Sequence, residues 1–315
     1  MKETDEFSIL KEFFQDLGSQ FHDSSGLIIG PGDDAGLFSE PNKELIFSTD
    51  VSVSGVHFLE NLEPNKIAFR SCVVAASDIA ACGGSLKWIS VSLVLATQDK
   101  SWIEDFAKGI IEFVNTYKVP VLGGDLAKGK ECSISVGVCG SINKDNFMSR
   151  SGAKLNDDVY VTGSLGDAYL GLNLLKGNKN LSESEVKYTN KYLKPKIEFE
   201  FAKELSLIAN SCIDLSDGLL GDLNHICEKS NLGATLFLEK IPFSGGYERA
   251  LTWGDDYELC FTLSPSKEKN LDELANKYSL KITKIGAMKE GRKVEVLDNE
   301  KEIHFNQSGY NHFNE

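Results

Sequence analysis

The sequence predicts an α/β fold built from two domains. Segments rich in β-branched residues and bounded by turn residues alternate along the chain with segments of helical periodicity. At 315 residues the chain is longer than one typical hydrophobic core, which favours two domains. Glycine-rich turns and acidic residues follow the strand-like segments in both halves. Because α/β proteins often build their sites at strand ends, we expect a functional site there.

The first domain is expected over residues 1–146. A β-rich run predicts a strand over 44–53. The next segment begins at Pro64 and ends at a glycine pair, as a helix does, because proline favours the first turn of a helix and glycine its end. Apolar residues at helical spacing predict a second helix over 99–118. Further strands are expected over 88–96, 119–125 and 132–142.

The second domain is expected over residues 147–315, after a polar connector. Its series of alternating elements resembles that of the first domain in composition, but the sequence carries no internal repeat long enough to establish a duplication. The predicted elements are strands over 159–166, 234–241, 257–263 and 281–288, helical stretches across 167–176 and 183–210, and helices over 223–230 and 266–279. The acidic stretch SCIDLSDGLL, residues 211–220, lies between the second helical stretch and the helix over 223–230.

Composition and charge exclude several classes of protein. The formal net charge of −14 argues against a nucleic-acid partner, whose binding needs a basic face. The longest apolar runs are too short to span a membrane, and the acidic start has no signal-peptide core, so we expect a cytoplasmic protein. Seven scattered cysteines without a C-x-x-C pair predict free thiols in a reducing compartment.

Two nucleotide-binding patterns occur in the sequence, and neither is in the required context. GPGDDA, residues 30–35, fits the dinucleotide fingerprint, but a hairpin and a strand are expected after it rather than a helix. GDLAKGKE, residues 124–131, begins like a P-loop, but Glu131 replaces the Ser or Thr and a strand-like segment follows. We therefore reject both assignments.

Aspartates recur at the ends of strand-like segments. Aspartate favours turns and helix N-caps, so each could be structural by itself, and we interpret Asp157 and Asp222 in that way. A recurrent set at strand ends is typical of a magnesium site, since magnesium prefers oxygen ligands and bridges carboxylates to phosphates. Magnesium would also explain how an acidic protein binds an anionic substrate. The set is Asp33, Asp34, Asp50, Asp78, Asp125, Asp214, Asp217, Asp255 and Asp256.

The sequence resembles the thiamine-monophosphate kinase family, within the aminoimidazole-ribonucleotide synthetase-like ATP-binding superfamily. Eight motifs occur in the family's order and span nearly the whole chain. They are GDDAG, STDVSVSGVHF, SDIAACGG, GGD, RSGAK, IDLSDGLLGDL, GDDYELCFT and GYNHF. The resemblance implies mixed sheets in two α/β domains. It implies that the N-terminal domain binds ATP and metal and forms the dimer, and that the C-terminal domain contributes to the nucleotide and substrate site. The activity that it implies is the phosphorylation of thiamine monophosphate with ATP by a homodimer.

The resemblance also implies roles for individual residues. Several magnesium ions would be held by Asp34, Ser48, Thr49, Asp50, Asp78, Asp125, Asp214 and Asp217. ATP would contact Gly124, Asp125, Arg150 and Ser216, and the thiamine end of the substrate would contact His57, Asp255 and Tyr310. The residues expected to carry catalysis are Asp50, Asp78, Asp125 and Arg150.

Two positions depart from the family pattern. Trp253 stands where a second glycine usually precedes the acidic pair, and Leu126 replaces the usual threonine after GGD. Trp253 could reshape the thiamine pocket, stack on a heteroaromatic ring, or pack on a neighbour at the rim. Substrate range is therefore open, while the phosphoryl chemistry is not affected.

We expect direct in-line transfer, because a phosphate monoester with a second pKa of about 6 is mostly a dianion at neutral pH and needs no general base. An aspartyl-phosphate intermediate is the competing mechanism. The alternative functions are another ATP-using enzyme of the same superfamily and a non-catalytic nucleotide-binding protein with the same fold.

Overall fold

The chain folds into two compact units in a computed structural model that describes residues 12–14, 16–29, 37–96, 99–177, 181–307 and 309–310. The first unit comprises Met1–Ile79 and Gly84–Lys144, and the second comprises Ala80–Gly83 and Asp145–Glu315. The two units are described separately.

The first unit is built on a mixed four-stranded sheet of described residues in the order β3-β6-β4-β5. The first three strands pair antiparallel, whereas β4 and β5 are parallel. The expected strand over 44–53 is confirmed with the same ends. The strands are β3 (Glu44–Val53), β4 (Ser85–Leu95), β5 (Val121–Lys128) and β6 (Ser133–Ile142).

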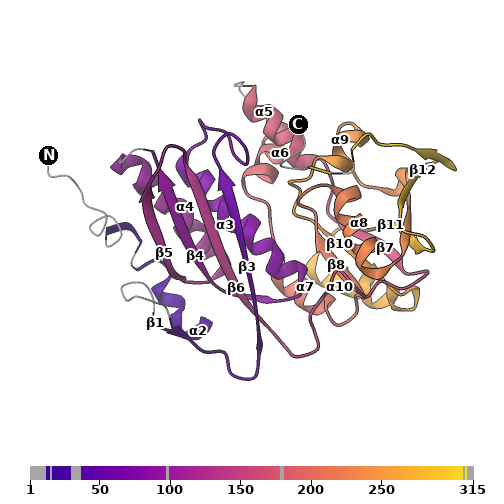
Figure 1. Cartoon of the computed structure of the whole chain (residues 1–315), viewed down its shortest axis with the longest axis horizontal. Helices are drawn as coiled ribbons and strands as arrows, with labels where there is room; N and C mark the ends of the chain where they lie inside the picture. Colours follow the sequence, from indigo (N-terminus) through magenta and orange to yellow (C-terminus); the bar gives the residue numbers. More distant parts are fainter. Residues whose placement is uncertain are drawn as a thin grey trace. The chain divides into compact units, whose positions relative to one another are not determined.

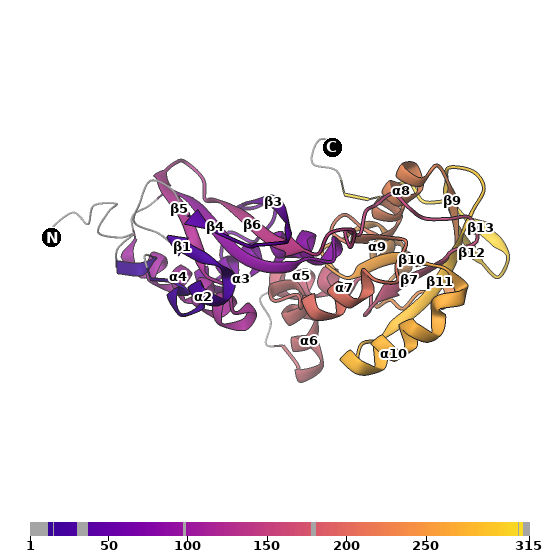
Figure 2. The ribbon, with the colours of Figure 1, turned by 90° about the horizontal axis from the view of Figure 1, so that it is seen from below.

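Two long helices, α3 (Pro64–Ala81) and α4 (Lys100–Tyr117), lie on one face of this sheet, as Figures 1 and 2 show. The Asp99 side chain accepts a hydrogen bond from Ser101 N and so caps α4. A Cβ on Gly109 would lie 2.0 Å from the carbonyl oxygen of Asn65, so only glycine allows the two helices to approach so closely. Near the start of the chain, a short segment of η1 (Ser19–Phe21) and α2 (His22–Ser25) precedes the two-stranded sheet of β1 (Leu27–Ile29) and β2 (Leu37–Phe38).

The opposite face of the four-stranded sheet carries exposed apolar side chains. Strand β3 alternates, so that Leu45, Phe47 and Val51 point away from the helices, and each is more than half exposed. Phe47 lies against Trp88 of β4, with 6.3 Å between the ring centroids. We call this surface the open face, defined by Leu45, Phe47 and Val51 with Trp88.

The second unit is built on a mixed seven-stranded sheet of described residues in the order β13-β12-β9-β11-β7-β10-β8. Its pairs are antiparallel except for β9 with β12. The strands are β7 (Asp158–Thr162), β8 (Ser211–Asp214), β9 (Gly233–Phe237), β10 (Leu259–Leu263), β11 (Ile282–Lys289), β12 (Val294–Asp298) and β13 (Lys301–Ile303).

Helices cover both faces of this sheet. Helix α8 (Leu219–Ser230) packs on one face, where Leu223 and Ile226 meet Val161 and Leu236 in a buried core. The other face carries the stacked rings of Tyr160 and Phe261, and Figure 2 shows α10 (Glu268–Tyr278) on that side. The remaining helical elements are α5 (Asp167–Lys176), α6 (Glu183–Leu193), α7 (Phe199–Leu205), η2 (Leu238–Lys240), α9 (Tyr247–Thr252) and η3 (Pro265–Lys267).

The second unit differs from the sequence-based expectation in several places, and the strand expected over 234–241 ends at Phe237, where η2 follows. The helix expected over 183–210 is two helices, α6 and α7, because Pro195 cannot continue a helix. Helix α8 begins at Leu219, four residues earlier than expected. Helix α9 and strands β12 and β13 were not expected, because these short segments lack a strong apolar period.

The remaining expectations concern the cysteines and membranes. All seven cysteines lie within the described ranges, and their thiols are free, as expected. Among the residues that the structure describes, no helix combines the length and the apolar character needed to cross a membrane.

Candidate functional site

In the first unit, three predicted ligands gather where β3 meets α3. Ser48 and Asp50 point to the helix-covered face of β3, and Asp78 lies on α3. The Ser48 hydroxyl donates a hydrogen bond to Asp78 Oδ2 at 2.5 Å. All three side chains are half-buried. The arrangement places carboxylate and hydroxyl oxygens together, and these are the ligands that magnesium prefers.

Thr49 and Asp125 lie on the other face of the same sheet. Side chains alternate along a strand, so Thr49 faces away from Asp78. Asp125 on β5 pairs with Ser92 on β4, and Ser92 pairs in turn with Ser135 on β6. The side chain of Asp125 is exposed on the open face. Two strands separate β5 from β3, and at about 4.8 Å per strand Asp125 lies roughly 14 Å from Asp50. Within one chain, the structure therefore does not bring Asp125 to Asp50.

Two further predicted residues of the first unit have clear local settings. Gly124 runs so close to β4 that a Cβ would lie 1.9 Å from the Val91 carbonyl oxygen, which explains the glycine. His57 follows β3, and its Nδ1 accepts a hydrogen bond from Val53 N at 3.0 Å. An accepting Nδ1 places the proton of the neutral ring on Nε2. Asp33 and Asp34 lie outside the described residues.

In the second unit, the loop between β8 and α8 carries three predicted residues. Asp214 ends β8 and is buried, while Ser216 and Asp217 are half-buried. We call residues 214–218 the first acidic loop. The Asp222 carboxylate, one turn into α8, accepts hydrogen bonds from the backbone of this loop. Burial, together with the charges of Asp214 and Asp217, raises the pKa of Asp222 to about 8.

A second acidic loop, residues 254–257, lies beside the first. Asp255 N donates to Ser216 O and Tyr257 N donates to Leu215 O, both at 2.9 Å. Asp255 is half-buried, with its Oδ1 3.4 Å from the Tyr257 hydroxyl. Asp256 is buried and accepts from Gly166 N at 2.8 Å, just before α5. Burial raises its pKa to about 7. The two acids of the pair therefore have different surroundings.

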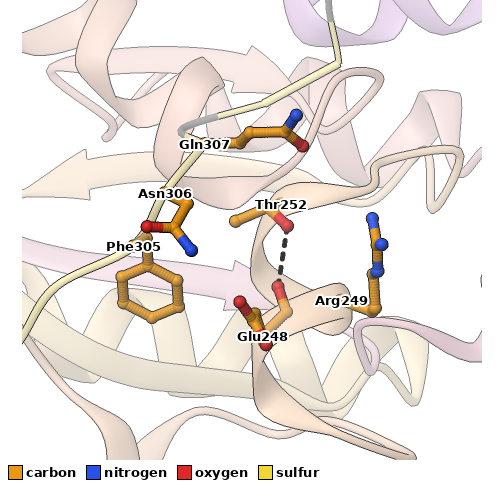
Figure 3. Close-up of a pocket in the computed structure, with 6 residues that line it drawn as sticks. All are labelled: Glu248, Arg249, Thr252, Phe305, Asn306 and Gln307. Carbon is orange, nitrogen blue, oxygen red and sulfur yellow. Dashed lines mark hydrogen bonds between the residues drawn. The ribbon is translucent and has the colours of Figure 1, made fainter.

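The C-terminal segment also reaches the first acidic loop. Tyr310 N donates to Asp217 O at 2.9 Å, which brings this predicted substrate residue next to a predicted metal ligand. Figure 3 shows a nearby pocket of about 330 Å³, between α9 and the segment that leads to Tyr310. The helix contributes Glu248, Arg249 and Thr252, and the segment contributes Phe305, Asn306 and Gln307.

Trp253 lies between this pocket and the second acidic loop. Its ring is half-buried, 5.0 Å from the ring of Tyr169 between centroids, and the Arg249 guanidinium lies 6.0 Å from it. Of the interpretations open at the sequence level, this geometry favours a rim tryptophan that packs on a neighbour.

Arg150 lies in an exposed turn that runs along the start of β8. Ser149 O accepts from Cys212 N, so the turn is fixed to the strand that ends in the first acidic loop. The buried Asp157 carboxylate holds the following residues, because its Oδ2 accepts from Lys154 N and from the Asn210 side chain, both at 2.8 Å. Asp157 and Asp222, interpreted as structural from sequence, thus both support loops that carry predicted site residues.

The described residues could hold magnesium only through one or two protein ligands at each ion, with water and substrate phosphate as the other ligands. Across the described ranges, no group of three His, Cys, Asp or Glu side chains could hold a metal ion by itself. Magnesium commonly keeps several waters and binds through one or two carboxylates and a substrate phosphate. The pair of Ser48 and Asp78 is consistent with such a site, and so are Asp214 and Asp217 on their loop.

Comparisons with known proteins define the class. The family model described as AIR synthase related protein, N-terminal domain, matches residues 32–142, and the model of the C-terminal domain matches residues 155–299. The chain is thus an AIR synthase related protein. The thiamine-monophosphate kinase of Buchnera aphidicola subsp. Schizaphis graminum is 38% identical, with 99% of both chains covered.

Solved structures agree with this match. A crystal structure of thiamine-monophosphate kinase from Stenotrophomonas maltophilia K279a superimposes with a TM-score of 0.81 at 31% identity, covering 88% of this chain and 94% of that chain. AaThiL complexed with AMPPCP and TMP gives a TM-score of 0.77 at 32% identity, covering 99% and 98%. The chain belongs to the thiamine-monophosphate kinase family. The predicted family and the mixed α/β fold class are confirmed.

Proposed function

We propose that this chain transfers the γ-phosphoryl group of ATP directly to the phosphate of thiamine monophosphate. ATP-dependent phosphorylation of thiamine monophosphate is the activity of the family to which the chain belongs. A substrate phosphate oxygen attacks the γ-phosphorus, the bond to the β–γ bridging oxygen breaks, and ADP leaves with thiamine diphosphate as product. The observation that carries the proposal is the family match over 99% of the chain.

The chain's acids hold and orient the phosphates in this proposal. The metal-holding residues are Asp34, Ser48, Thr49, Asp50, Asp78, Asp125, Asp214 and Asp217, and the ions are magnesium. Bound magnesium neutralises phosphate charge, which is the main obstacle when a dianion approaches ATP. The residues proposed to carry catalysis are Asp50, Asp78, Asp125 and Arg150. Gly124, Asp125, Arg150 and Ser216 contact ATP.

The thiamine end of the substrate contacts His57, Asp255 and Tyr310. No general base is required, because the attacking phosphate is already ionised. This agrees with His57, whose Nδ1 already accepts a hydrogen bond from Val53 N. Two residues that line the pocket, Thr252 and Gln307, each lie three residues before a proposed thiamine contact, Asp255 and Tyr310 respectively. The pocket is therefore proposed to adjoin the thiamine end.

The protein acts as a homodimer that pairs through the open face. Exposed apolar side chains along the edge strand β3, such as Phe47 at 63% exposure, are a liability unless another surface covers them. A two-fold interface brings the same surface of both copies together. A dimer through the open face would allow Asp125 of a second copy to approach the β3 edge, which the Asp125 of the same chain does not reach.

Mixing two inactive variants tests the dimer and the shared site together. Asp50→Asn and Asp125→Asn should each lose activity while melting stays near wild type, because removing one of several repelling acids costs little stability. If Asp50 and Asp125 from different copies form one site, each mixed dimer has one intact site, and random mixing restores about a quarter of wild-type activity. A mixture that remains inactive would show that each site lies within one chain or that no dimer forms.

A product assay tests the activity itself. The protein is incubated with thiamine monophosphate, ATP and magnesium, and each component is omitted in turn. Thiamine diphosphate and ADP are the expected products. A cyclised product or AMP would indicate another activity of the superfamily, and ATP binding without turnover would indicate a non-catalytic relative. Label from [γ-³²P]ATP that stays on the denatured protein after a single turnover would contradict direct transfer.

The compartment and the domain roles belong to the same proposal. Free thiols and ATP as co-substrate agree with a cytoplasmic protein. Residues 1–146 form the ATP- and metal-binding and dimerisation domain, and residues 147–315 contribute to the nucleotide and substrate site.

A further inference from the structure

Asp222 is a buried carboxylate with no place in the proposed chemistry. Only 2% of its surface is exposed, and the neighbouring charges are the carboxylates of Asp214 and Asp217. A polar side chain is buried at little cost only where specific hydrogen bonds replace its contacts with water. Its hydrogen bonds therefore indicate what the residue does.

These bonds hold the first acidic loop. Asp222 Oδ2 accepts from Asp217 N and from Gly218 N, both at 3.1 Å. Asp222 N donates in turn to Gly218 O at 3.0 Å, so Gly218 is held at its amide and at its carbonyl. Gly218 has φ of 116°, a backbone conformation that favours glycine. One carboxylate thus fixes a strained turn.

The two hydrogen bonds to the Asp222 carboxylate fix the first acidic loop in addition to the N-terminus of α8. Helix α8 begins at Leu219, so Asp222 is its fourth residue. A usual N-cap side chain lies before the helix and accepts from N–H groups of its first turn. The Asp222 carboxylate reaches backwards instead, to the N–H of the N-cap residue Gly218, as in a capping box, and to the N–H of Asp217, which lies outside the helix.

The fixed loop organises the surrounding candidates. Its carbonyl groups at Ser216 and Asp217 accept from Asp255 N and Tyr310 N, both at 2.9 Å. Displacing the backbone at 216–218 would therefore shift residues proposed for the nucleotide end and for the thiamine end together.

We infer that Asp222 is a positioning residue, whose two backbone hydrogen bonds set the first acidic loop so that ATP and thiamine monophosphate are held in reacting geometry. The inference rests on the proposed roles of Asp217, Asp255 and Tyr310. Asp222 acts through the backbone, and misplacement of a site by about 1 Å can cost about 100-fold in rate.

Three substitutions at this position test the inference. Asp222→Asn keeps an oxygen acceptor of the same shape, Asp222→Glu keeps the carboxyl group but moves its oxygens by one methylene, and Asp222→Ala removes the acceptor. The expected KM values for ATP and thiamine monophosphate rise about tenfold or more in Asp222→Ala and Asp222→Glu, with a lower kcat. In Asp222→Asn both KM values stay within about threefold of wild type.

Thr262→Val is the matched control. It removes a buried hydrogen bond between the Thr262 and Ser211 hydroxyls, 2.7 Å apart, in the same sheet but away from the loop. This control should lower the melting temperature without changing either KM. If Asp222→Ala does not fold, Asp222→Glu against Asp222→Asn still decides the question.

The outcomes separate this inference from the proposed function. Titration calorimetry with the non-hydrolysable analogue AMPPCP and magnesium measures nucleotide affinity without turnover. The affinity should be lowered in Asp222→Ala and Asp222→Glu and nearly unchanged in Asp222→Asn. Unchanged KM and affinity in Asp222→Ala, or equal defects in Asp222→Asn and Asp222→Ala, would overturn the positioning role. Wild-type protein that binds AMPPCP but forms no thiamine diphosphate would instead contradict the proposed function.

Discussion

The two acidic loops of the second unit lie side by side and are supported in different ways. In the first loop, residues 214–218, the supporting carboxylate comes from outside, from Asp222 on α8. In the second, residues 254–257, it comes from inside, because Asp256 bonds to Gly166 N ahead of α5. Each loop leaves one acid half-buried next to the other loop, Asp217 in the first and Asp255 in the second.

The second loop also shows that two adjacent aspartates, Asp255 and Asp256, can have different roles. A buried acid that accepts backbone N–H groups is an anchor, whereas its neighbour keeps its carboxylate at the surface of the loop. The second loop also adopts left-handed backbone at Gly254, Asp255 and Tyr257, with φ between 48° and 87°. Such backbone is unfavourable for non-glycine residues and persists where the surroundings impose it.

The largest effect is expected where the loops meet, at Gly254. In Gly254→Ala the new Cβ would lie 2.1 Å from the Ser216 carbonyl oxygen, at a φ of 87°. We expect a loss of about 3 kcal/mol in the free energy of unfolding and loss of most activity, because both loops must move. Denaturant melts and the product assay measure the two effects.

Gly246→Ala is the control for that substitution. It precedes α9 in the same unit, and no atom lies within 4 Å of its added Cβ. The variant should stay within about 0.5 kcal/mol of wild type, with normal activity. Equal stability of the two variants would show that the loops can separate without cost.

A smaller, pH-dependent effect is expected at Asp256. Its pKa is raised to about 7 in the folded protein, so the protonated form is favoured by folding. The stabilisation is present below the unfolded pKa of 3.8 and is lost as pH rises toward 7. Between pH 4 and pH 7, the free energy of unfolding of Asp256→Asn should therefore rise by on the order of 2 kcal/mol relative to that of wild type.

The helix cap Asp99 provides a control of opposite sign. Hydrogen bonds from Ser101 lower the pKa of Asp99, so its contribution is present above its unfolded pKa and is lost in acid. Urea melts at several pH values should show Asp99→Asn losing stability relative to wild type as pH rises. A difference in stability between wild type and Asp256→Asn that does not change with pH would contradict the raised pKa of Asp256.

The smallest effect is expected at Trp253, beside the second loop. Replacing it by the family's usual glycine removes the ring contact with Tyr169 and should cost about 1–2 kcal/mol of stability. The KM for thiamine monophosphate should change by no more than about twofold, because the ring packs on the protein. Trp253→Phe keeps a ring contact and serves as the control. A tenfold rise of KM in Trp253→Gly would show that the ring stacks on substrate.

The sequence predicts local features better than it predicts which residues meet. Strand β3 and helix α3 follow from β-branched runs, proline and glycine, all of which act within a few residues. The separation of Asp125 from Asp50 depends on the strand order β3-β6-β4-β5, which long-range pairing decides. The opposite directions of Thr49 and Asp50, in contrast, follow directly from the period of a strand.

The anchors are the part of the site that sequence reasoning interprets least well. Asp157 lies in none of the eight motifs, and Asp222 lies in IDLSDGLLGDL, which does not separate its role from those of Asp214 and Asp217. The roles of Asp157 and Asp222 depend on contacts with backbone N–H groups. One available signal for Asp222 is its position one turn inside a helix that follows a glycine-containing loop, from which a carboxylate can reach back.

Separate kinetics for the two half-buried acids test the central claim most directly. Asp217 is proposed to hold magnesium with the phosphates of ATP, and Asp255 is proposed to contact the thiamine end, although the loops that carry them are hydrogen-bonded to each other. KM values for ATP and for thiamine monophosphate are measured in Asp217→Asn and Asp255→Asn. We expect Asp217→Asn to raise the KM for ATP about tenfold or more with little change in the KM for thiamine monophosphate. We expect Asp255→Asn to raise the KM for thiamine monophosphate by a similar factor with little change in the KM for ATP. The same KM rising in both variants, or neither rising, would contradict the central claim.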